Sequence, residues 1–371
     1  MTNKFLTTVA NNPSHPLQRS LNVYSSQNFL HTSGPIPEFI KNMNNLQIDL
    51  KNLIHQPISY PPWSLKPIQM EFYLRNYPKH DHSPSSIKSH YLELLSNYTE
   101  YNLCFTDGSK ISNIHTGYAY SINDKVLSFK IHNCASIFTA ELTAIKHCLI
   151  DIISIQSENK KFLIQSDSLS SLLSIQNIFS DHPIVQDIHK SLFNLQYYDY
   201  SISFMYVPSH IGITGNETVD RLAKTAATPS PLTTLTPDDI KSLITHNTFT
   251  NWQNFWSQQT SNKLFQHKKT TLPWKNLGHL NRKEEILITR LRIGHTKITH
   301  NHLYQKEPKP SCQFCRNEPI SIQHILFNCP QLKQNRLTLQ IKENPPTIPD
   351  EPSEIQKFIS LIKNINLTNQ I

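Results

Sequence analysis

Apolar and polar residues alternate with a period of two along five short stretches in the middle of the chain. This alternation is typical of strands whose two faces meet different surroundings. The predicted strands span residues 101–107, 116–122, 126–132, 162–166 and 201–207. The pair Asn123-Asp124, between the second and third strands, is a hairpin signal.

Between and after these strands, apolar residues recur every three or four positions, which predicts helices with one buried face. The predicted helices span residues 136–153, 168–178, 184–195 and 215–227. Three hairpin-linked strands followed by alternating helices and strands indicate an α/β domain with a mixed five-stranded sheet flanked by helices. We assign this domain to residues 99–228, because the segment Pro229-Ser230-Pro231 ends the pattern.

The flanking segments have weaker patterns. Residues 1–60 are rich in Asn, Ser, Pro and His, and residues 1–98 show helical periodicity at 36–54 and 85–98. We expect this part to be a linker with short helices, partly disordered. Residues 236–340 predict a small helical region, with helices at 237–265 and 281–293. Residues 341–371 contain four prolines, and we expect a weakly ordered tail there.

Composition changes this picture mainly through charge. The net charge of +8 arises in the second half of the chain, because residues 1–229 carry 17 basic and 17 acidic residues, whereas residues 230–371 carry 18 and 10. A basic half attached to a neutral half suggests a polyanionic partner, and a simple solubility feature is an equal alternative. We expect the basic region to bind nucleic acid, and the oligomeric state stays open.

Targeting signals are absent from the sequence pattern. The first 25 residues lack the apolar core of a signal peptide, and no apolar run approaches the length of a membrane span. We therefore expect an intracellular protein without membrane contact, and the pattern does not choose between nucleus and cytoplasm. Three of the six cysteines cluster near His324, which favours a reducing compartment and a metal site over disulfides.

Carboxylates stand at the places where the predicted sheet would bring them together. Asp107 and Asp167 are each expected to end a strand, and carboxyl ends of strands collect reactive groups in α/β sheets. Asp220 lies on the last helix of the domain, and taken alone it is a solvated helix residue. His210 lies on the loop before that helix.

Glu141 is the most informative of these residues. Its neighbours one helical turn away are apolar, so its side chain is predicted to point into the core. An unpaired ionised carboxylate there would cost several kcal/mol, and no Lys or Arg lies one turn away on that face. Glu141 is therefore neutralised, paired with a cation or bound to metal, or else its side chain reaches water at the edge of the buried stripe.

Taken together, three Asp, one Glu and one His fit metal-assisted phosphoryl transfer. Mg²⁺ prefers carboxylate oxygens and water. Two such ions about 4 Å apart activate a water on one side of a phosphate and stabilise the leaving oxygen on the other.

Four motifs in order and in register resemble the ribonuclease H domain of non-LTR (LINE-type) retrotransposon polyproteins. They are FTDGSK at 105–110, ASIFTAELTAI at 135–145, QSDSLSSL at 165–172 and VPSHIGITGNETVDRLAK at 207–224. The resemblance implies endonucleolytic hydrolysis of the RNA strand of an RNA–DNA hybrid, with two Mg²⁺ ions held by Asp107, Glu141, Asp167 and Asp220. It further implies that His210 assists proton movement or product release.

The short link between the helices at 168–178 and 184–195 leaves little room for the basic protrusion that some cellular ribonucleases H use. We therefore expect hybrid affinity to come from elsewhere, with the basic C-terminal half as the main candidate. Two other functions remain open: a catalytically inactive nucleic-acid-binding remnant of a retroelement, and a nuclease that acts on DNA.

The C-terminal cysteines have zinc-type spacing. Cys312, Cys315, His324 and Cys329 supply three thiolates and one imidazole, which suits a closed tetrahedral Zn²⁺ site in a small zinc-knuckle-like segment. Coincidence is the alternative. The arrangement resembles the cysteine/histidine motif that follows the ribonuclease H domain in these elements. Trp252 and Trp256 have helical spacing and are expected to be core residues rather than base-stacking ones.

Overall fold

The computed structural model describes residues 2–10, 12, 15–21, 34–46, 48–49, 62–112, 114–155, 157–232, 235–262, 264–265, 268–273, 280–341, 348 and 351–371. The chain divides into two compact units, unit 1 (Met1–His246) and unit 2 (Asn247–Ile371). No helix among the described residues is both long enough and apolar enough to cross a membrane.

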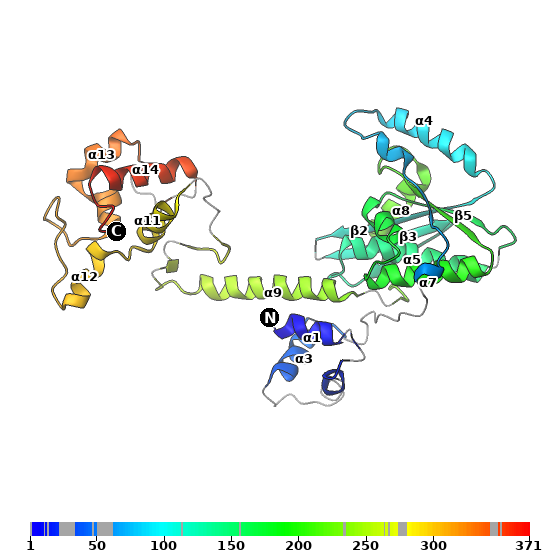
Figure 1. Ribbon diagram of the computed structural model, residues 1–371, viewed down its shortest axis with the longest axis horizontal. Coiled ribbons are helices and arrows are strands. Elements are labelled where there is room, and N and C mark those ends of the chain that lie inside the picture. Colours follow the sequence, from blue (N-terminus) through cyan, green and yellow to red (C-terminus); the bar gives the residue numbers. More distant parts are fainter. Residues whose placement is uncertain are drawn as a thin grey trace. The chain divides into compact units, whose positions relative to one another are not determined.

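Unit 1 is built on one mixed sheet of strand order β1-β6-β5-β2-β3-β4 (Figure 1). The strands are β1 (Gln69–Glu71), β2 (Asn102–Ile111), β3 (His115–Ile122), β4 (Lys125–Ile131), β5 (Lys161–Ser166) and β6 (Ser201–Tyr206). Strands β2, β3 and β4 pair antiparallel, while β1–β6, β6–β5 and β5–β2 pair parallel. The predicted α/β class is confirmed. The sheet has six strands rather than five, because β1 joins its edge.

Alternation along the strands sends successive side chains to opposite faces of this sheet. Ile164 and Phe204 pack into the large core cluster, while their neighbours Leu163 and Met205 belong to a separate cluster on the other face. Helices cover both faces (Figure 1). The first face carries α5 (Ile137–Ile155), α6 (Leu169–Gln176) and α7 (Pro183–Tyr197), and the second carries α4 (Pro84–Leu95) and α8 (Thr214–Thr225).

The predicted hairpin at Asn123 is present between β3 and β4. Asn123 has φ of 49°, in the left-handed region that Asn tolerates better than most residues and that tight hairpins require. Gly117 on β3 lets α8 approach the sheet, since a Cβ there would lie 2.5 Å from the Ala223 carbonyl oxygen.

The folded unit extends beyond residue 228 on its C-terminal side. Asp239 lies in the first turn of helix α9 (Pro237–Ser257) and is 3% exposed. Its carboxylate accepts hydrogen bonds from the Ser136 backbone N–H at 2.8 Å and from the Thr139 hydroxyl at 2.8 Å, at the start of α5. Leu235 and Ile240 join the core cluster. Polar contacts and packing therefore continue past Pro229-Ser230-Pro231.

On the N-terminal side, α1 (Thr2–Ala10) and α3 (Pro35–Asn45) pack against each other. The helix expected at 36–54 ends at Asn45, and its residues 50–54 lie outside the described part of the chain. Helix α4 agrees with the helix expected at 85–98 and is followed by a short 3₁₀ turn, Ser96–Tyr98.

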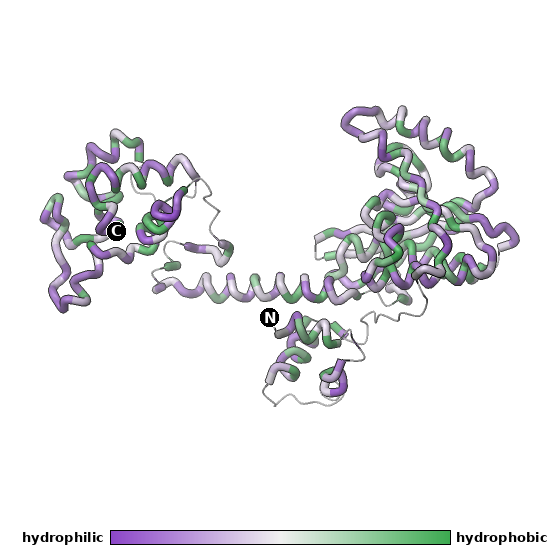
Figure 2. The backbone as a smooth tube through the Cα atoms, in the orientation of Figure 1, coloured by the Kyte–Doolittle hydropathy of each residue, from purple (hydrophilic) through white to green (hydrophobic). Residues whose placement is uncertain are grey.

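Unit 2 has a core of its own, formed by helices and by the cysteine segment. Its helices are α11 (Arg282–Ile293), α12 (Lys297–Gln305), α13 (Lys333–Thr338) and α14 (Pro352–Asn364). Asn281 and Glu284 form a capping box at the start of α11, and Gly294 ends that helix with φ of 73°. The changes between hydrophobic and hydrophilic residues along these helices are visible in Figure 2.

The expectation of a weakly ordered tail at 341–371 is wrong for its second half. Ile355, Phe358 and Ile362 of α14 are at most 1% exposed, and they pack in one cluster with Leu287 and Ile325. The apolar side of α14 packs against α11 and the cysteine segment. The local sequence of α14 alone does not identify these partners.

The two tryptophans expected in a core differ. Trp252 is 51% exposed on α9 and stacks with Phe249, so the prediction is wrong for this residue. Trp256 is half-buried, donates its indole N–H to the Lys268 carbonyl at 2.7 Å and meets the edge of Phe265.

Candidate active site

Two strand segments deliver the first two carboxylates to the same edge of the sheet. The parallel ladder between β2 and β5 ends with the pair Thr106 and Ser166, so Asp107 and Asp167 are the next residue on each side. Asp107 does not end its strand, contrary to our expectation. It pairs with Ala119 of β3, and β2 continues to Ile111. Asp107 thus leaves the parallel ladder while an antiparallel neighbour still holds its backbone.

Glu141 reaches this edge from the first turns of α5. One carboxylate oxygen from each of Asp107, Glu141 and Asp167 lies within 4.8 Å of the others. Gly108 makes this approach possible, since a Cβ on it would lie 2.4 Å from the Glu141 backbone nitrogen. The side chain of Glu141 is 6% exposed, so the alternative that it reaches water at the edge of the helix does not hold.

The pKa of each of the three carboxylates is raised, with burial as the largest cause. Burial, followed by the charges of Asp167 and Asp220, raises the pKa of Asp107 to about 8. Burial and the charge of Asp107 raise the pKa of Glu141 well above its ordinary value, although the Gly108 backbone N–H donates to it and opposes the rise. Burial also raises the pKa of Asp167. Like charges at this spacing are stable together only when protons or a cation neutralise them.

Two oxygens of this group fit a cation in particular. Within the described part of the chain, Asp107 Oδ2 and Glu141 Oε2 are buried without a hydrogen-bond partner. Buried polar atoms without partners are rare, because each costs about 1–3 kcal/mol. A hard divalent cation prefers carboxylate oxygen, so these residues fit such an ion.

Asn216 contacts the carboxylate group, and the sequence analysis did not identify it as a candidate site residue. Its side-chain amide donates to Asp167 Oδ2 at 3.4 Å, and the residue is 3% exposed. Asn216 lies one turn before Asp220 on α8, so the two share a helix face. That spacing, within the GNETVD motif, was the signal that could have identified it.

Asp220 lies near the three carboxylates but outside their compact group. Its charge raises the pKa of Asp107, and its carboxylate forms an ion pair with Lys224 at 2.7 Å, four residues along α8. Such partly exposed pairs contribute about 0–1 kcal/mol, so Lys224 is easily displaced by a stronger cation. Three of the four predicted carboxylates therefore converge, and the fourth lies beside them with a competing partner.

His210 is exposed on the loop between β6 and α8, with φ of 53°. It lies outside the compact carboxylate group. Near the end of this loop, the Gly212 backbone N–H donates to Glu217 Oε1 at 2.8 Å.

A second candidate metal centre lies in unit 2. The ligand atoms of Cys312, Cys315, His324 and Cys329 lie within 4.8 Å of one another. The Cys312 and Cys329 sulfurs are 3.9 Å apart, and the Cys315 sulfur lies 3.3 Å from His324 Nε2. Tetrahedral bonds of about 2.3 Å from zinc to sulfur place two sulfurs about 3.8 Å apart, so the donor set fits.

The surroundings of these four ligands support metal binding. The Asn317 backbone N–H lowers the pKa of the Cys315 thiol to about 7, which favours the metal-binding thiolate. The Glu318 carboxylate lies 2.8 Å from His324 Nδ1, where it orients the imidazole. His324 belongs to a single π-helical turn, His324–Asn328, which turns the chain toward Cys329.

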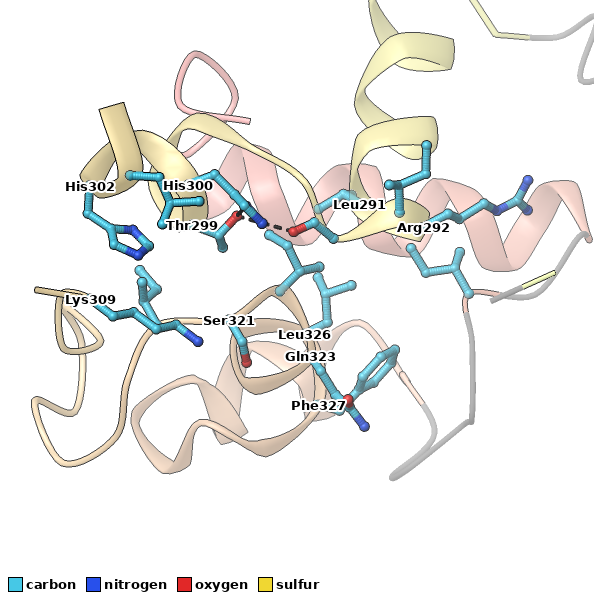
Figure 3. A pocket seen from close by; sticks show the side chains of 16 residues that line it. Leu291, Arg292, Thr299, His300, His302, Lys309, Ser321, Gln323, Leu326 and Phe327 are labelled. Atoms are coloured by element: carbon cyan, nitrogen blue, oxygen red, sulfur yellow. Dashed lines mark hydrogen bonds between the residues drawn. The ribbon is translucent and has the colours of Figure 1, made fainter. Parts of the chain in front are cut away.

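Next to this centre, unit 2 contains a cavity of about 390 Å³. Figure 3 shows Leu291 and Leu326 along its wall and His302 beside Lys309 at one rim. Ser321, Ile322 and Gln323, which immediately precede the ligand His324, form part of the lining. Among the described lining residues, none is acidic and four are basic or imidazole side chains: Arg292, His300, His302 and Lys309.

The geometry agrees with a comparison of the sequence with protein families. The family model for RNase H matches residues 99–228. No curated protein matches the chain. The match, the mixed sheet and the carboxylates at its edge all indicate an RNase H domain at residues 99–228.

Asp107→Asn tests the charge balance of the site. The variant removes one of three mutually repelling carboxylates, so we expect a higher melting temperature than the parent in chelator. A divalent cation at about 100 times its dissociation constant should stabilise the parent by about 2.7 kcal/mol and the variant far less. The measurement is thermal unfolding with and without Mg²⁺ or Mn²⁺. Asp124→Asn, at an exposed hairpin, is the matched control and should behave like the parent. An equal cation effect in both variants would contradict the assignment.

Proposed function

We propose that the protein is a Mg²⁺-dependent ribonuclease H that cuts the RNA strand of RNA–DNA hybrids endonucleolytically. The main support is the convergence of Asp107, Glu141 and Asp167 inside an RNase H domain. Two oxygens of this group, Asp107 Oδ2 and Glu141 Oε2, are buried without a hydrogen-bond partner among the described residues. We further propose a non-LTR retrotransposon origin. The four motifs of the domain and the Cys₃His group that follows it support this origin.

Each residue of the site has a proposed part. Asp107, Glu141 and Asp167, with Asp220 after release from Lys224, would hold two Mg²⁺ ions. When bound, such ions supply an activated water and stabilise the leaving oxygen. Asn216 holds Asp167 in orientation through its amide. His210, exposed on its loop, is available to take up or deliver a proton as product leaves.

Cleavage of a labelled RNA–DNA hybrid in Mg²⁺ tests this function directly. We expect cuts within the RNA strand by the parent and a rate lower by about 10²–10³-fold for Asp107→Asn, because an electrostatic group at the reacting phosphate is lost. Asp124→Asn is again the control and should cut like the parent.

Three outcomes would contradict the proposal. Equal cleavage by the parent and Asp107→Asn would remove the carboxylates from the mechanism. Hybrid binding without Mg²⁺-dependent cleavage would favour an inactive nucleic-acid-binding remnant. Faster cleavage of duplex DNA than of hybrid would favour a DNA-acting nuclease.

We also propose that Cys312, Cys315, His324 and Cys329 hold a structural Zn²⁺. Cys312 and Cys329 are fully buried and belong to the core cluster of unit 2, so the ion would stabilise that core directly. A structural zinc contributes about 10–16 kcal/mol of apparent binding free energy to folding near neutral pH.

Metal analysis of the purified chain tests the zinc site. We expect one zinc per chain in the parent and none in Cys329→Ala, together with loss of cooperative unfolding of unit 2 when a zinc chelator is added. Cys134→Ala removes a cysteine from unit 1 and should retain the zinc. A folded parent that contains no zinc and resists chelation would contradict the proposal.

Unit 2 is the proposed second nucleic-acid contact. Residues 247–371 carry 17 basic and 8 acidic residues. The cavity beside the cysteine segment combines apolar walls with Lys309 and His302, and His302 Nδ1 is buried without a partner among the described residues. We propose that this cavity receives an unstacked base of a single-stranded nucleic acid, with Lys309 at the adjoining phosphate.

Binding of a fluorescent single-stranded oligonucleotide tests this contact. We expect Lys309→Ala to weaken binding about 3–10-fold and to lower the salt slope by about one, as the loss of one phosphate contact predicts. Lys333→Ala, at an exposed lysine outside the cavity, should change affinity less. Equal affinity of Lys309→Ala and the parent would exclude the cavity from binding.

A further inference from the structure

The RNase H family match begins at residue 99, yet the fold of unit 1 begins earlier. We use the term extension for residues 62–98. Its strand β1 pairs in parallel with β6, from Gln69 against Ser203 to Glu71 against Met205. A 3₁₀ turn, Tyr73–Asn76, and helix α4 follow β1. The extension therefore supplies the sixth strand and one of the covering helices, which a linker would not do.

The loop that carries His210 lies on the extension. We define this loop as residues 207–213. Its isoleucines Ile211 and Ile213 are 3% and 5% exposed. They pack in one hydrophobic cluster with Leu74, Ile87 and Tyr91, all from the extension. Removal of these partners would expose both isoleucines, so the path of the loop depends on residues outside the family match.

Two lysines of the extension bind the loop on either side of His210. Lys88 Nζ donates to the Gly212 carbonyl at 2.6 Å, and Lys79 Nζ donates to the Ser209 hydroxyl at 2.8 Å. Gly212 has φ of 82°, in the region that favours glycine, and His210 also has positive φ, at 53°. Since a histidine with positive φ is uncommon, the contacts around it select a conformation that the loop alone would rarely adopt.

The extension also reaches the strand that leads to the carboxylates. The Tyr91 hydroxyl donates to Gln165 Oε1 at 2.8 Å, and both residues are buried. Gln165 lies two residues before Asp167 on β5. Helix α4 thus contacts the His210 loop through Lys88 and the β5 strand through Tyr91, and it fixes the two relative to each other.

We propose that the extension is a positioning element of the hydrolytic site and that Lys88 is its main positioning residue. Lys88 holds the loop so that His210 faces the substrate in one orientation, and Lys79 supports the same loop from the other side. This inference rests on the proposed ribonuclease H function for its kinetic consequence, while the placement of the loop is independent of that function.

The test compares Lys88→Met with the parent full-length protein. Met keeps the apolar length of the side chain and removes the donor to Gly212. We expect kcat for hybrid cleavage to fall about tenfold with KM changed less than twofold, since orientation of a reacting group affects the rate more than substrate binding. Lys88→Arg retains a donor and should recover most of kcat. Lys66→Met is the matched control, because Lys66 contacts Gln196 through its backbone N–H and carbonyl.

A double variant separates positioning from simple destabilisation. In a His210→Ala background, Lys88→Met should lower kcat by less than twofold more, because the residue being positioned is gone. A full further tenfold loss in that background, or a fall in kcat that follows a lower melting temperature, would overturn the proposal. Lys79→Ala is an independent variant. It should also lower kcat less in the His210→Ala background than in the parent.

Hydrogen exchange of the backbone amides at residues 209–213 gives a readout that needs no activity. We expect faster exchange there in Lys88→Met and not in Lys66→Met. If the parent fails to cleave hybrid while the exchange still rises, the proposed function is wrong and the positioning of the loop stands. Exchange equal to the parent in Lys88→Met would overturn the positioning role, whether or not the protein cleaves.

Discussion

The contact between Gly108 of β2 and the backbone of α5 is the constraint on which the site depends. A side chain at residue 108 would separate helix and strand, and Glu141 would then no longer lie within 4.8 Å of Asp107 and Asp167. The same approach creates a cost, because it buries carboxylates that repel one another. The apolar contacts of α5 with the sheet hold the group together against that repulsion.

Much of this arrangement could be predicted from the sequence, because the strongest signals were local. Glu141 was identified from a charge on an apolar helix face. Asp167 was identified from its position after a buried strand. The position of Asp107 beside the other carboxylates was also predicted, but its strand was predicted to stop there. The pairing that extends β2 to Ile111 is antiparallel and comes from β3, and a single strand pattern contains no information about its neighbour.

The features that were missed depend on partners far away in the sequence. Strand β1 has only three residues, and it is a strand because its backbone pairs with β6. Because prolines precede α14, its segment was predicted to be weakly ordered. Phe358 and Ile359 are nevertheless almost fully buried in the core cluster of unit 2. In both cases a short element is stabilised by tertiary packing rather than by local propensity. Cysteine spacing was easier to interpret, because metal ligands must lie close together in space and their types are few.

Family boundaries and physical boundaries differ at both ends of this domain, and the reason is the same at each end. Residues 99–228 contain the candidate carboxylates, whereas the extension and the start of α9 pack against this segment. Asp239 lies 11 residues beyond the family match and accepts a hydrogen bond from the Ser136 backbone N–H, just before α5. Lys88 does the equivalent for the carbonyl of Gly212. The buried carboxylates at the sheet edge repel one another, so the surrounding backbone must be held in place. On each flank a charged side chain binds that backbone: Asp239 at Ser136 and Lys88 at Gly212.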